Sequence, residues 1–180
     1  MNNLIVFTGG PGSGKTSVID ALKNQGYRCA PEVGRKVIQQ QVEQQGSALP
    51  WSDKVAFRDE MVREELANYQ AFELSEKLVF FDRSIVDSYG YSVLESLSIT
   101  ESLLNKCEEL EYNSKVFIFP PWEAIFVNDQ ERKQDFEEAV ATYEKMVEAY
   151  TRFGYQLVEV PKSSVEERVE FILNSINSDE

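Results

Sequence analysis

The feature that most constrains this chain is a glycine-rich segment between an apolar run and an amphipathic stretch. Residues 9–16 read Gly-Gly-Pro-Gly-Ser-Gly-Lys-Thr, which fits the pattern G-x-x-x-x-G-K-[S/T]. The preceding run, Leu4–Phe7, is short and continuously apolar, as is typical of a strand buried on both faces. Apolar residues with helical spacing follow from residue 17 to residue 22. A strand, this loop and a helix in that order distinguish a phosphate-binding loop from a chance glycine-rich turn.

The loop predicts a site for the phosphates of a nucleoside triphosphate with Mg²⁺. Glycines let backbone amides approach an anion closely, and the helix that follows adds its positive end. Lys15 can reach the β- and γ-phosphate oxygens, and the Thr16 hydroxyl suits a magnesium ion. We expect the cofactor ATP to be bound by Gly9, Gly10, Pro11, Gly12, Ser13, Gly14, Lys15, Thr16 and Ser17.

Short apolar runs alternate with longer helical patterns along the whole chain. The predicted strands are Leu4–Phe7, Tyr27–Ala30, Leu78–Phe81, Lys115–Phe119 and Tyr155–Val160. The predicted helices are residues 17–24, 35–45, 53–76, 86–97, 101–111, 133–153 and 164–176, with a loop over 122–131 and a frayed end over 177–180. This alternation is the signature of an α/β three-layer fold, with a five-stranded parallel sheet and helices on both faces. We expect one P-loop domain over residues 1–180.

Composition excludes several classes of function. The formal net charge is −13, which disfavours a nucleic-acid binder or a protein that docks on anionic membranes. The chain has no histidine, so Ser-His-Asp and Cys-His catalysis are excluded. With two cysteines and no apolar run long enough for a signal or a membrane span, we expect a cytoplasmic protein with reduced thiols, monomeric or homodimeric.

Asp82 and Arg83 follow the apolar run Leu78–Phe81. A carboxylate at the end of a buried strand, with the glycine-rich motif upstream, predicts a magnesium-ordering group of the Walker B type. The alternative is an aspartate that only caps the next helix. Arg83 could clamp a phosphate through paired hydrogen bonds, or form an ordinary surface salt bridge. We assign Asp82 to metal binding with Thr16, and both Asp82 and Arg83 to catalysis.

Three further residues are candidates for the acceptor side and for a lid. Glu32 follows the second strand, at the edge where open α/β sheets bind ligands, and Arg35 lies three residues later. With Arg83 they form the expected substrate-binding set, although Glu32 could instead be a helix-terminal residue favoured by the dipole. The charged segment 128–133 could be a lid that brings Arg132 over the transferred phosphate; the alternative is a solvated loop.

Other features are expected to be structural. Asp87-Ser88-Tyr89-Gly90 and Asn105-Lys106-Cys107-Glu108 resemble guanine-nucleotide motifs, but neither directly follows a strand. We interpret both as coincidences, which disfavours a GTP-specific switch. Trp51, Phe57 and Trp122 are interpreted as core or loop-anchoring residues, and Trp122 as a possible border of the ligand cleft.

Several segments together resemble a family of small AAA-domain P-loop proteins. They are residues 7–16, 31–35, 81–84, 128–132 and 154–161. Such proteins are similar to nucleotide and nucleoside kinases, including thymidylate kinase and ribosylnicotinamide kinase. The resemblance implies ATP as donor and a kinase-like lid, with Lys15, Thr16, Asp82, Arg83 and Arg132 at the phosphates and Mg²⁺ and Glu32 facing the acceptor.

The residues therefore favour an ATP- and Mg²⁺-dependent phosphotransferase that acts on a small molecule such as a nucleoside or nucleotide. Catalysis would rest on positioning and charge stabilisation. The alternative is an ATPase, less well supported as a GTPase, that couples hydrolysis to a protein partner. A binding module without turnover is disfavoured by the intact Lys15, Thr16 and Asp82.

Overall fold

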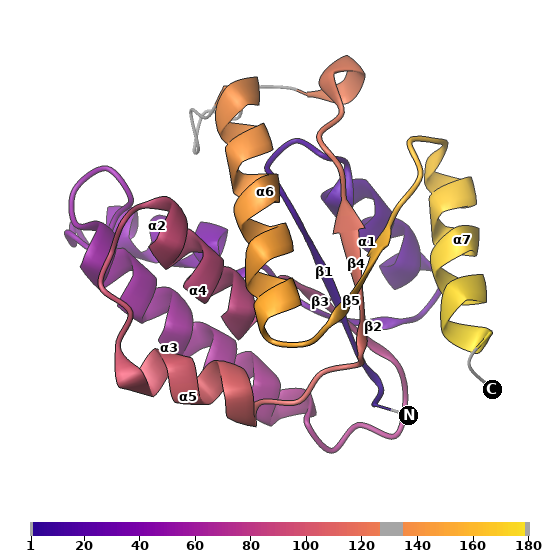
Figure 1. Ribbon diagram of the computed structural model, residues 1–180, viewed down its shortest axis with the longest axis horizontal. Coiled ribbons are helices and arrows are strands. Elements are labelled where there is room, and N and C mark those ends of the chain that lie inside the picture. Colours follow the sequence, from indigo (N-terminus) through magenta and orange to yellow (C-terminus); the bar gives the residue numbers. More distant parts are fainter. Residues whose placement is uncertain (1, 127–134, 179–180) are drawn as a thin grey trace.

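The computed structural model describes residues 2–126 and 135–178. Its five strands are β1 (Leu4–Gly9), β2 (Arg28–Ala30), β3 (Val79–Asp82), β4 (Lys115–Phe119) and β5 (Gln156–Glu159). They form one sheet in the order β2-β3-β1-β4-β5, and every neighbouring pair is parallel. The predicted five-stranded parallel sheet is thus confirmed (Figure 1).

Helices cover both faces of the sheet. Helices α1 (Lys15–Asn24) and α7 (Val165–Asn177) pack together on one face. The other face carries α3 (Lys54–Phe72), α4 (Ile85–Leu94) and α6 (Phe136–Arg152), with α2 (Val33–Glu43) against α3 and α5 (Glu101–Glu109) against α4. Figure 1 shows α4 and α6 on one side of the strands and α1 and α7 on the other, as the three-layer prediction requires.

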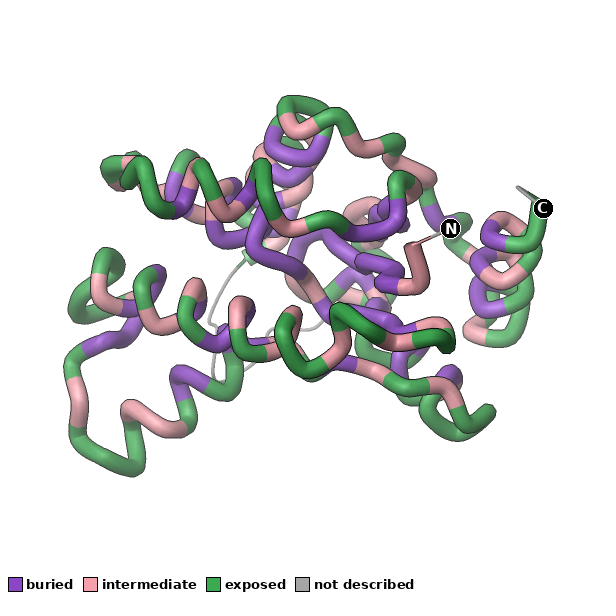
Figure 2. The backbone as a smooth tube through the Cα atoms, turned by 90° about the horizontal axis from the view of Figure 1, so that it is seen from below, coloured by how far each residue is buried: buried purple, intermediate pink, exposed green. Residues whose placement is uncertain are grey.

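Side chains along β1 point alternately to the two faces of the sheet, and they contribute to two separate hydrophobic cores. Leu4 and Val6 pack beneath α4 and α6, whereas Ile5 and Phe7 pack beneath α1 and α7. All four are fully or almost fully buried, because successive side chains of a strand point to opposite faces and this central strand is covered on both. Figure 2 shows the buried strands in the middle and exposed positions along the outer helices.

A third, smaller cluster lies away from the sheet, between α2 and α3. Val33, Val37 and Ile38 of α2 pack there against Phe57 and Met61 of α3. This cluster fixes how α2 and α3 stand beside the sheet, and it forms one wall of a cavity described below.

The strand order opens a crevice at the carboxyl ends of the central strands, where open α/β sheets commonly bind ligands. The chain leaves β1 toward β2 on one side, yet β4 pairs with β1 on the other side. Connections that leave neighbouring strands in opposite directions open a crevice beyond the carboxyl ends of those strands. The glycine-rich loop follows β1 directly, so it lies at this crevice.

Several predicted boundaries differ from the structure. Helix α2 begins at Val33, two residues before the expected Arg35, and α6 begins at Phe136 after the capping residue Asp135. The expected loop 122–131 contains a short 3-10 helix, η1 (Glu123–Ile125), and α7 continues through Asn177, which was expected to fray. Helix ends are set by capping contacts, and these shift a boundary by a few residues relative to the apolar pattern.

Trp51 was expected to be a core or loop-anchoring residue; its exposed fraction of 60% rules out the core position. Phe57, by contrast, is buried as expected.

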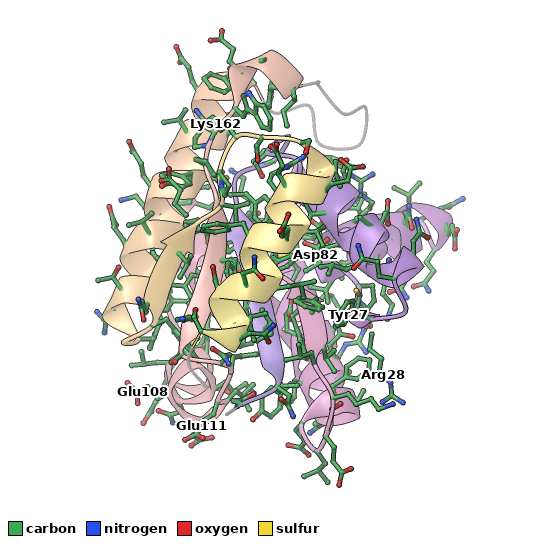
Figure 3. All side chains as sticks on the ribbon, turned by 90° about the vertical axis from the view of Figure 1, so that its right-hand side faces the viewer. Tyr27, Arg28, Asp82, Glu108, Glu111 and Lys162 are labelled. Atoms are coloured by element: carbon green, nitrogen blue, oxygen red, sulfur yellow. The ribbon has the colours of Figure 1, made fainter. Side chains whose placement is uncertain are left out.

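Charged residues lie at both ends of the sheet: Figure 3 places Lys162 at the carboxyl end and Glu108 and Glu111 at the opposite end. None of the helices described here combines the length and the apolar character that crossing a bilayer requires.

Candidate active site

Two glycines of the loop are required by close packing. A Cβ atom on Gly9 would lie 2.5 Å from the carbonyl oxygen of Phe119, and one on Gly10 would lie 2.3 Å from the carbonyl oxygen of Ala139. Carbon and oxygen atoms do not approach so closely without displacing backbone. The loop can therefore pass between β4 and α6 only because these positions lack side chains.

The last residues of the loop lead into α1, and the first turn of this helix faces the crevice. Gly12 and Gly14 adopt φ angles of 68° and 84°, which side-chain-bearing residues rarely adopt. Gly14 is the N-cap of α1 and supplies no capping side chain. The amides of the first helical turn are therefore not taken up by a side-chain cap, and helix N-termini of this kind attract phosphate. The Ser13 hydroxyl donates to the Gly10 carbonyl at 2.9 Å and braces the loop.

Lys15 and Asp82 form a buried ion pair. Asp82 lies opposite Phe7 in the register of β3 and β1, so the end of β3 faces the start of the loop. The Lys15 ammonium contacts the Asp82 carboxylate, and both side chains are less than 10% exposed. Asp82 does not cap helix α4, because Ser84 does so. The capping alternative for Asp82 is thus excluded.

Arg83 is held in an unusual conformation between two carboxylates. Its φ angle is 74°, a strained value for a residue with a side chain. Its Nη1 lies 3.0 Å from Asp87 Oδ1, and its Nε lies 3.7 Å from Glu32 Oε1. The Arg83 side chain is only 12% exposed, so the surface-salt-bridge alternative does not describe it.

Asp87 is a residue of this site that the sequence analysis dismissed as a coincidental motif match. The Thr8 hydroxyl donates to its Oδ1 at 2.6 Å, the Ser84 amide donates to its Oδ2 at 3.0 Å, and the Tyr150 hydroxyl also donates to Oδ2. The spacing of Ser84 and Asp87 matches a helix capping box, a signal that could have identified it. Asp87 therefore ties β1, α4 and α6 to Arg83.

A cleft of about 470 Å³ lies over the glycine-rich loop. Loop residues from Gly10 to Ser17 line it, and Thr16 and Ser17 are exposed. Among the described residues that line this cleft, four are cationic and one is acidic: Lys15, Arg35, Arg83, Arg168 and Glu32. A surplus of cations beside open amides is the arrangement that a polyphosphate requires.

Arg168 is the second residue that sequence reasoning missed. It is 5% exposed, its Nη1 donates to the Gly14 carbonyl at 3.3 Å, and its guanidinium lies 5.4 Å from the centre of the Trp122 ring. Burial lowers the pKa of Arg168 below its usual value. The contact supports the interpretation of Trp122 as a loop-anchoring residue; Arg168 lines the cleft, and Trp122 is not among the described residues that line it.

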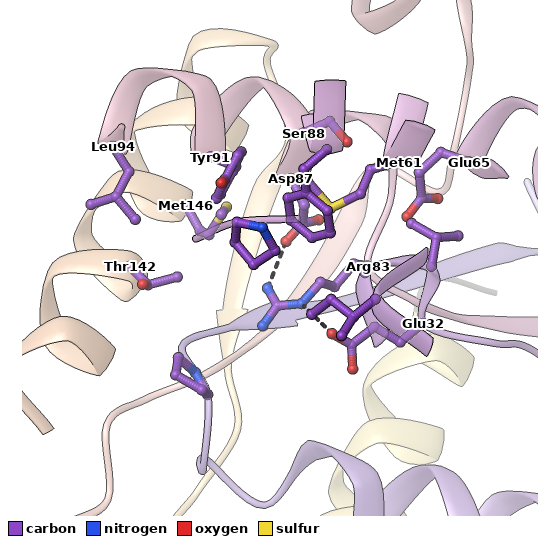
Figure 4. Close-up of a pocket in the computed structure, with 16 residues that line it drawn as sticks. Glu32, Met61, Glu65, Arg83, Asp87, Ser88, Tyr91, Leu94, Thr142 and Met146 are labelled. Atoms are coloured by element: carbon purple, nitrogen blue, oxygen red, sulfur yellow. Dashed lines mark hydrogen bonds and ion pairs between the residues drawn. The ribbon is translucent and has the colours of Figure 1, made fainter. Parts of the chain in front are cut away.

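A second cavity, of about 130 Å³, opens beside the cleft, between α2, α3, α4 and α6 (Figure 4). Its walls are mainly apolar, with Val33, Ile38, Phe57, Met61 and Met146 among them. Pro11, Glu32 and Arg83 line both the cavity and the cleft. Two ligands bound in these spaces would therefore meet at Glu32 and Arg83.

The structure brings most of the predicted site residues together. Glu32 is the N-cap residue of α2 and makes no side-chain capping hydrogen bond. Its place at the helix N-terminus fits the dipole alternative, and it also lines both the cleft and the cavity. Arg35 lies on the first turn of α2 and borders the cleft from an exposed position. Arg132, with the expected lid 128–133, lies outside the described residues. Its predicted role remains untested.

Comparisons with known proteins agree with this geometry. The model of a family described as AAA domain matches residues 4–168. Deoxyadenosine kinase from M. mycoides, solved with dCMP and dCDP bound, superposes with a TM-score of 0.66 at 16% identity, covering 97% of this chain and 99% of that chain. Thymidylate kinase from Candida albicans gives 0.69 at 13% identity, over 99% and 92% of the two chains.

A third solved structure, NadR in complex with NR, gives a TM-score of 0.67 at 14% identity, covering 98% of this chain and 50% of that chain. No curated protein sequence matches significantly. At such low identity these likenesses concern the fold. They show that the strand order, the loop and the helices of this chain are arranged as in nucleoside and nucleotide kinases.

Proposed function

Because this chain belongs to the AAA-domain family, whose model covers residues 4–168, we propose that it is an ATP- and Mg²⁺-dependent phosphotransferase acting on a small molecule. The kinase fold of its structural relatives supports this proposal. The acceptor would be a nucleoside, a nucleotide or a compound of similar build.

The observation that carries the proposal is the junction of the two spaces. A cation-rich cleft over the glycine-rich loop suits the triphosphate, and an apolar cavity beside it suits an organic acceptor. They share Glu32 and Arg83, so donor and acceptor would meet beside a carboxylate and a guanidinium. A switch that only hydrolyses ATP has no need of such a second cavity.

The reaction follows from this placement. An acceptor oxygen attacks the γ-phosphorus, the new O–P bond forms, and the bond from the γ-phosphorus to the β,γ-bridging oxygen breaks. ADP leaves with that electron pair, and an acceptor hydroxyl would lose its proton to a carboxylate such as Glu32. Lys15 and Arg83 would stabilise the charge that develops on the phosphoryl oxygens, and positioning supplies the rest of the catalysis.

Magnesium would be held by few protein groups. The described residues contain no cluster of three or more acidic, histidine or cysteine side chains suited to a metal ion. Mg²⁺ bound with a nucleotide needs only one or two protein ligands, since phosphate oxygens and waters supply the others. The exposed Thr16 hydroxyl and the Asp82 carboxylate fit this need. The ion would neutralise charge on the β- and γ-phosphates.

The test is an ADP-release assay with ATP·Mg²⁺ and a panel of nucleosides and nucleotides. We expect ADP formation that depends on an acceptor, together with a phosphorylated product found by mass spectrometry. Hydrolysis of ATP at one rate with and without every acceptor would instead indicate the ATPase alternative.

A further inference from the structure

The second cavity has more acidic than basic residues in its lining, whereas the cleft over the glycine-rich loop has more basic than acidic ones. The charged or acidic residues that line it, among those described, are Glu32, Glu65, Arg83 and Asp87. Glu32 and Asp87 outnumber the one guanidinium even without the buried Glu65, whereas the cleft has four cations and one carboxylate. An anionic group is attracted by the cleft and repelled by the cavity.

Arg83 is the one cationic residue among the described residues that line the cavity, and it is already paired. Arg83 lies 3.0 Å from Asp87 and 3.7 Å from Glu32 (Figure 4). A phosphate on the acceptor would have to compete with both carboxylates for this guanidinium and would lie close to their negative charges. Like charges placed together in a partly buried site are strongly unfavourable.

Glu65 gives an independent indication that the cavity binds a polar group. It comes from the middle of α3, is 2% exposed and lines the cavity. Its Oε2 atom is buried and has no hydrogen-bond partner among the described residues. Buried polar atoms are almost always hydrogen-bonded, and one that is not calls for a ligand or another explanation.

The surroundings of this carboxyl group favour its protonated form. Burial first, and then the negative charges of Asp87 and Asp82, raise the pKa of Glu65 well above its usual range, against the smaller opposing effects of Arg83 and Lys15. A protonated carboxyl group has one O–H donor as well as acceptor atoms. It can therefore exchange hydrogen bonds with a neutral hydroxyl.

A second polar atom lies across the cavity. The hydroxyl of Tyr91 is buried without a hydrogen-bond partner among the described residues, and Figure 4 shows Tyr91 and Glu65 on opposite sides of Arg83. The cavity wall also carries the apolar side chains of Phe57, Met61 and Met146. The cavity thus suits a body with apolar faces and an uncharged polar group at each end.

We propose that the acceptor is an uncharged, nucleoside-like alcohol rather than a nucleoside monophosphate, and that Glu65 recognises it by hydrogen bonding. This inference rests on the proposed phosphotransferase function and narrows it. The reacting group is then a hydroxyl, whose oxygen attacks the γ-phosphorus of ATP, whose proton passes to a carboxylate, and whose product is a phosphate monoester with ADP as the other product.

The experiment compares nucleosides with their own 5′-monophosphates as acceptors, using ADP release and mass spectrometry of the products. We expect nucleosides to be phosphorylated with a kcat/KM at least about tenfold above that of the matched monophosphates. Preferred phosphorylation of monophosphates would overturn the inference and leave the proposed function intact. If neither class is phosphorylated while ATP still binds, both fail.

Variants of Glu65 test its proposed role in recognising the acceptor. Glu65→Leu should raise the KM for the nucleoside about tenfold, the loss expected for one buried hydrogen bond, with the KM for ATP unchanged. Glu65→Gln keeps a donor and an acceptor and should restore most of the affinity. The matched control is Glu64→Gln on the same helix, since Glu64 pairs with Lys36 and does not line the cavity. An unchanged nucleoside KM in Glu65→Leu would contradict the assignment.

Discussion

Charged side chains at this site are arranged by burial and by their partners. Lys15 and Asp82 neutralise each other where almost no water reaches them. Such a pair contributes little net stability, because desolvation offsets most of the attraction. Its value is positional: the ammonium group is held at the base of the cleft, beside the amides that would receive the phosphates.

Lys15→Ala tests that role. We expect the variant to lose about a hundredfold or more of the acceptor-dependent turnover, since removal of one group that stabilises transition-state charge has this magnitude. Steady-state ADP release measures the effect. Lys23→Ala is the control, because Lys23 is on the same helix with a half-exposed side chain. Equal turnover in the Lys15 variant and the wild type would refute the phosphate-binding role.

Glu65 should also affect the dependence of stability on pH. Its folded-state pKa is raised, so above the unfolded pKa, near 4.3, the folded state retains a proton that the unfolded state has released. The free energy of unfolding therefore falls as pH rises through this window, by about 1.4 kcal/mol per pH unit until the folded pKa is reached.

The side chain of the variant Glu65→Gln cannot ionise, so its contribution to the free energy of unfolding should not fall as pH rises. Urea unfolding at several pH values should show that the unfolding free energy of the variant rises relative to that of the wild type as pH increases from about 5. Glu73→Gln, at the exposed end of the same helix, supplies the comparison. A difference between Glu65→Gln and the wild type that stays constant with pH would show that Glu65 is ionised throughout.

At the level of elements, the site depends on where backbone segments touch. The loop after β1 lies against the last residue of β4 and against α6, and its glycines allow this contact. The loop therefore holds its shape through contacts with segments more than one hundred residues away in the chain. Helix α4 contributes through its cap, because Ser84 and Asp87 fix the first turn next to Arg83.

Gly10→Ala should displace the loop, because the new methyl group would meet the Ala139 carbonyl at 2.3 Å. We expect the loss of detectable ATP binding by calorimetry and a cost of about 1–3 kcal/mol in unfolding free energy. Gly26→Ala is the control: no atom lies within 4 Å of its Cβ position, and only the cost of its φ angle of 89° applies. Normal ATP affinity in Gly10→Ala would show that this contact does not shape the site.

On the scale of the whole molecule, positive charge is concentrated at one place although the net charge of the chain is negative. The chain carries a formal net charge of −13, yet four cations gather around the phosphate cleft. An anionic ligand is therefore drawn to one place, and the rest of the surface repels it. Glu108 and Glu111, at the far end of the sheet in Figure 3, belong to this acidic remainder.

Binding at the cleft should stabilise the entire fold, because α1, β3 and the loop belong to the central sheet assembly. At an ATP·Mg²⁺ concentration one hundred times the Kd, the gain is about 2.7 kcal/mol, equivalent to a Tm rise of roughly 5–10 °C. Differential scanning fluorimetry measures it, with EDTA and AMP as controls. A Tm indifferent to millimolar ATP·Mg²⁺ would remove the basis of every functional proposal made above.

Local patterns sufficed to predict the sheet and the phosphate loop. The strands β1, β3 and β4 are mainly runs of adjacent apolar residues, and the loop is a contiguous motif, so these are visible within a short window of sequence. The strands β2 and β5 have only two apolar residues each and are less distinct. Family resemblance added the kinase-like architecture. Asp82 and Arg83 could be predicted as site residues because Asp82 ends β3 and Arg83 follows it directly.

The rest was decided by the tertiary structure, because it depends on contacts between distant residues. Thr8 and Asp87 are 79 positions apart, and Gly14 and Arg168 are 154 apart. The cavity beside the cleft is likewise assembled from four helices, and Glu65 looks in the sequence like any acidic residue of a long helix. Burial and proximity give such side chains their chemistry, and a sequence window contains neither quantity.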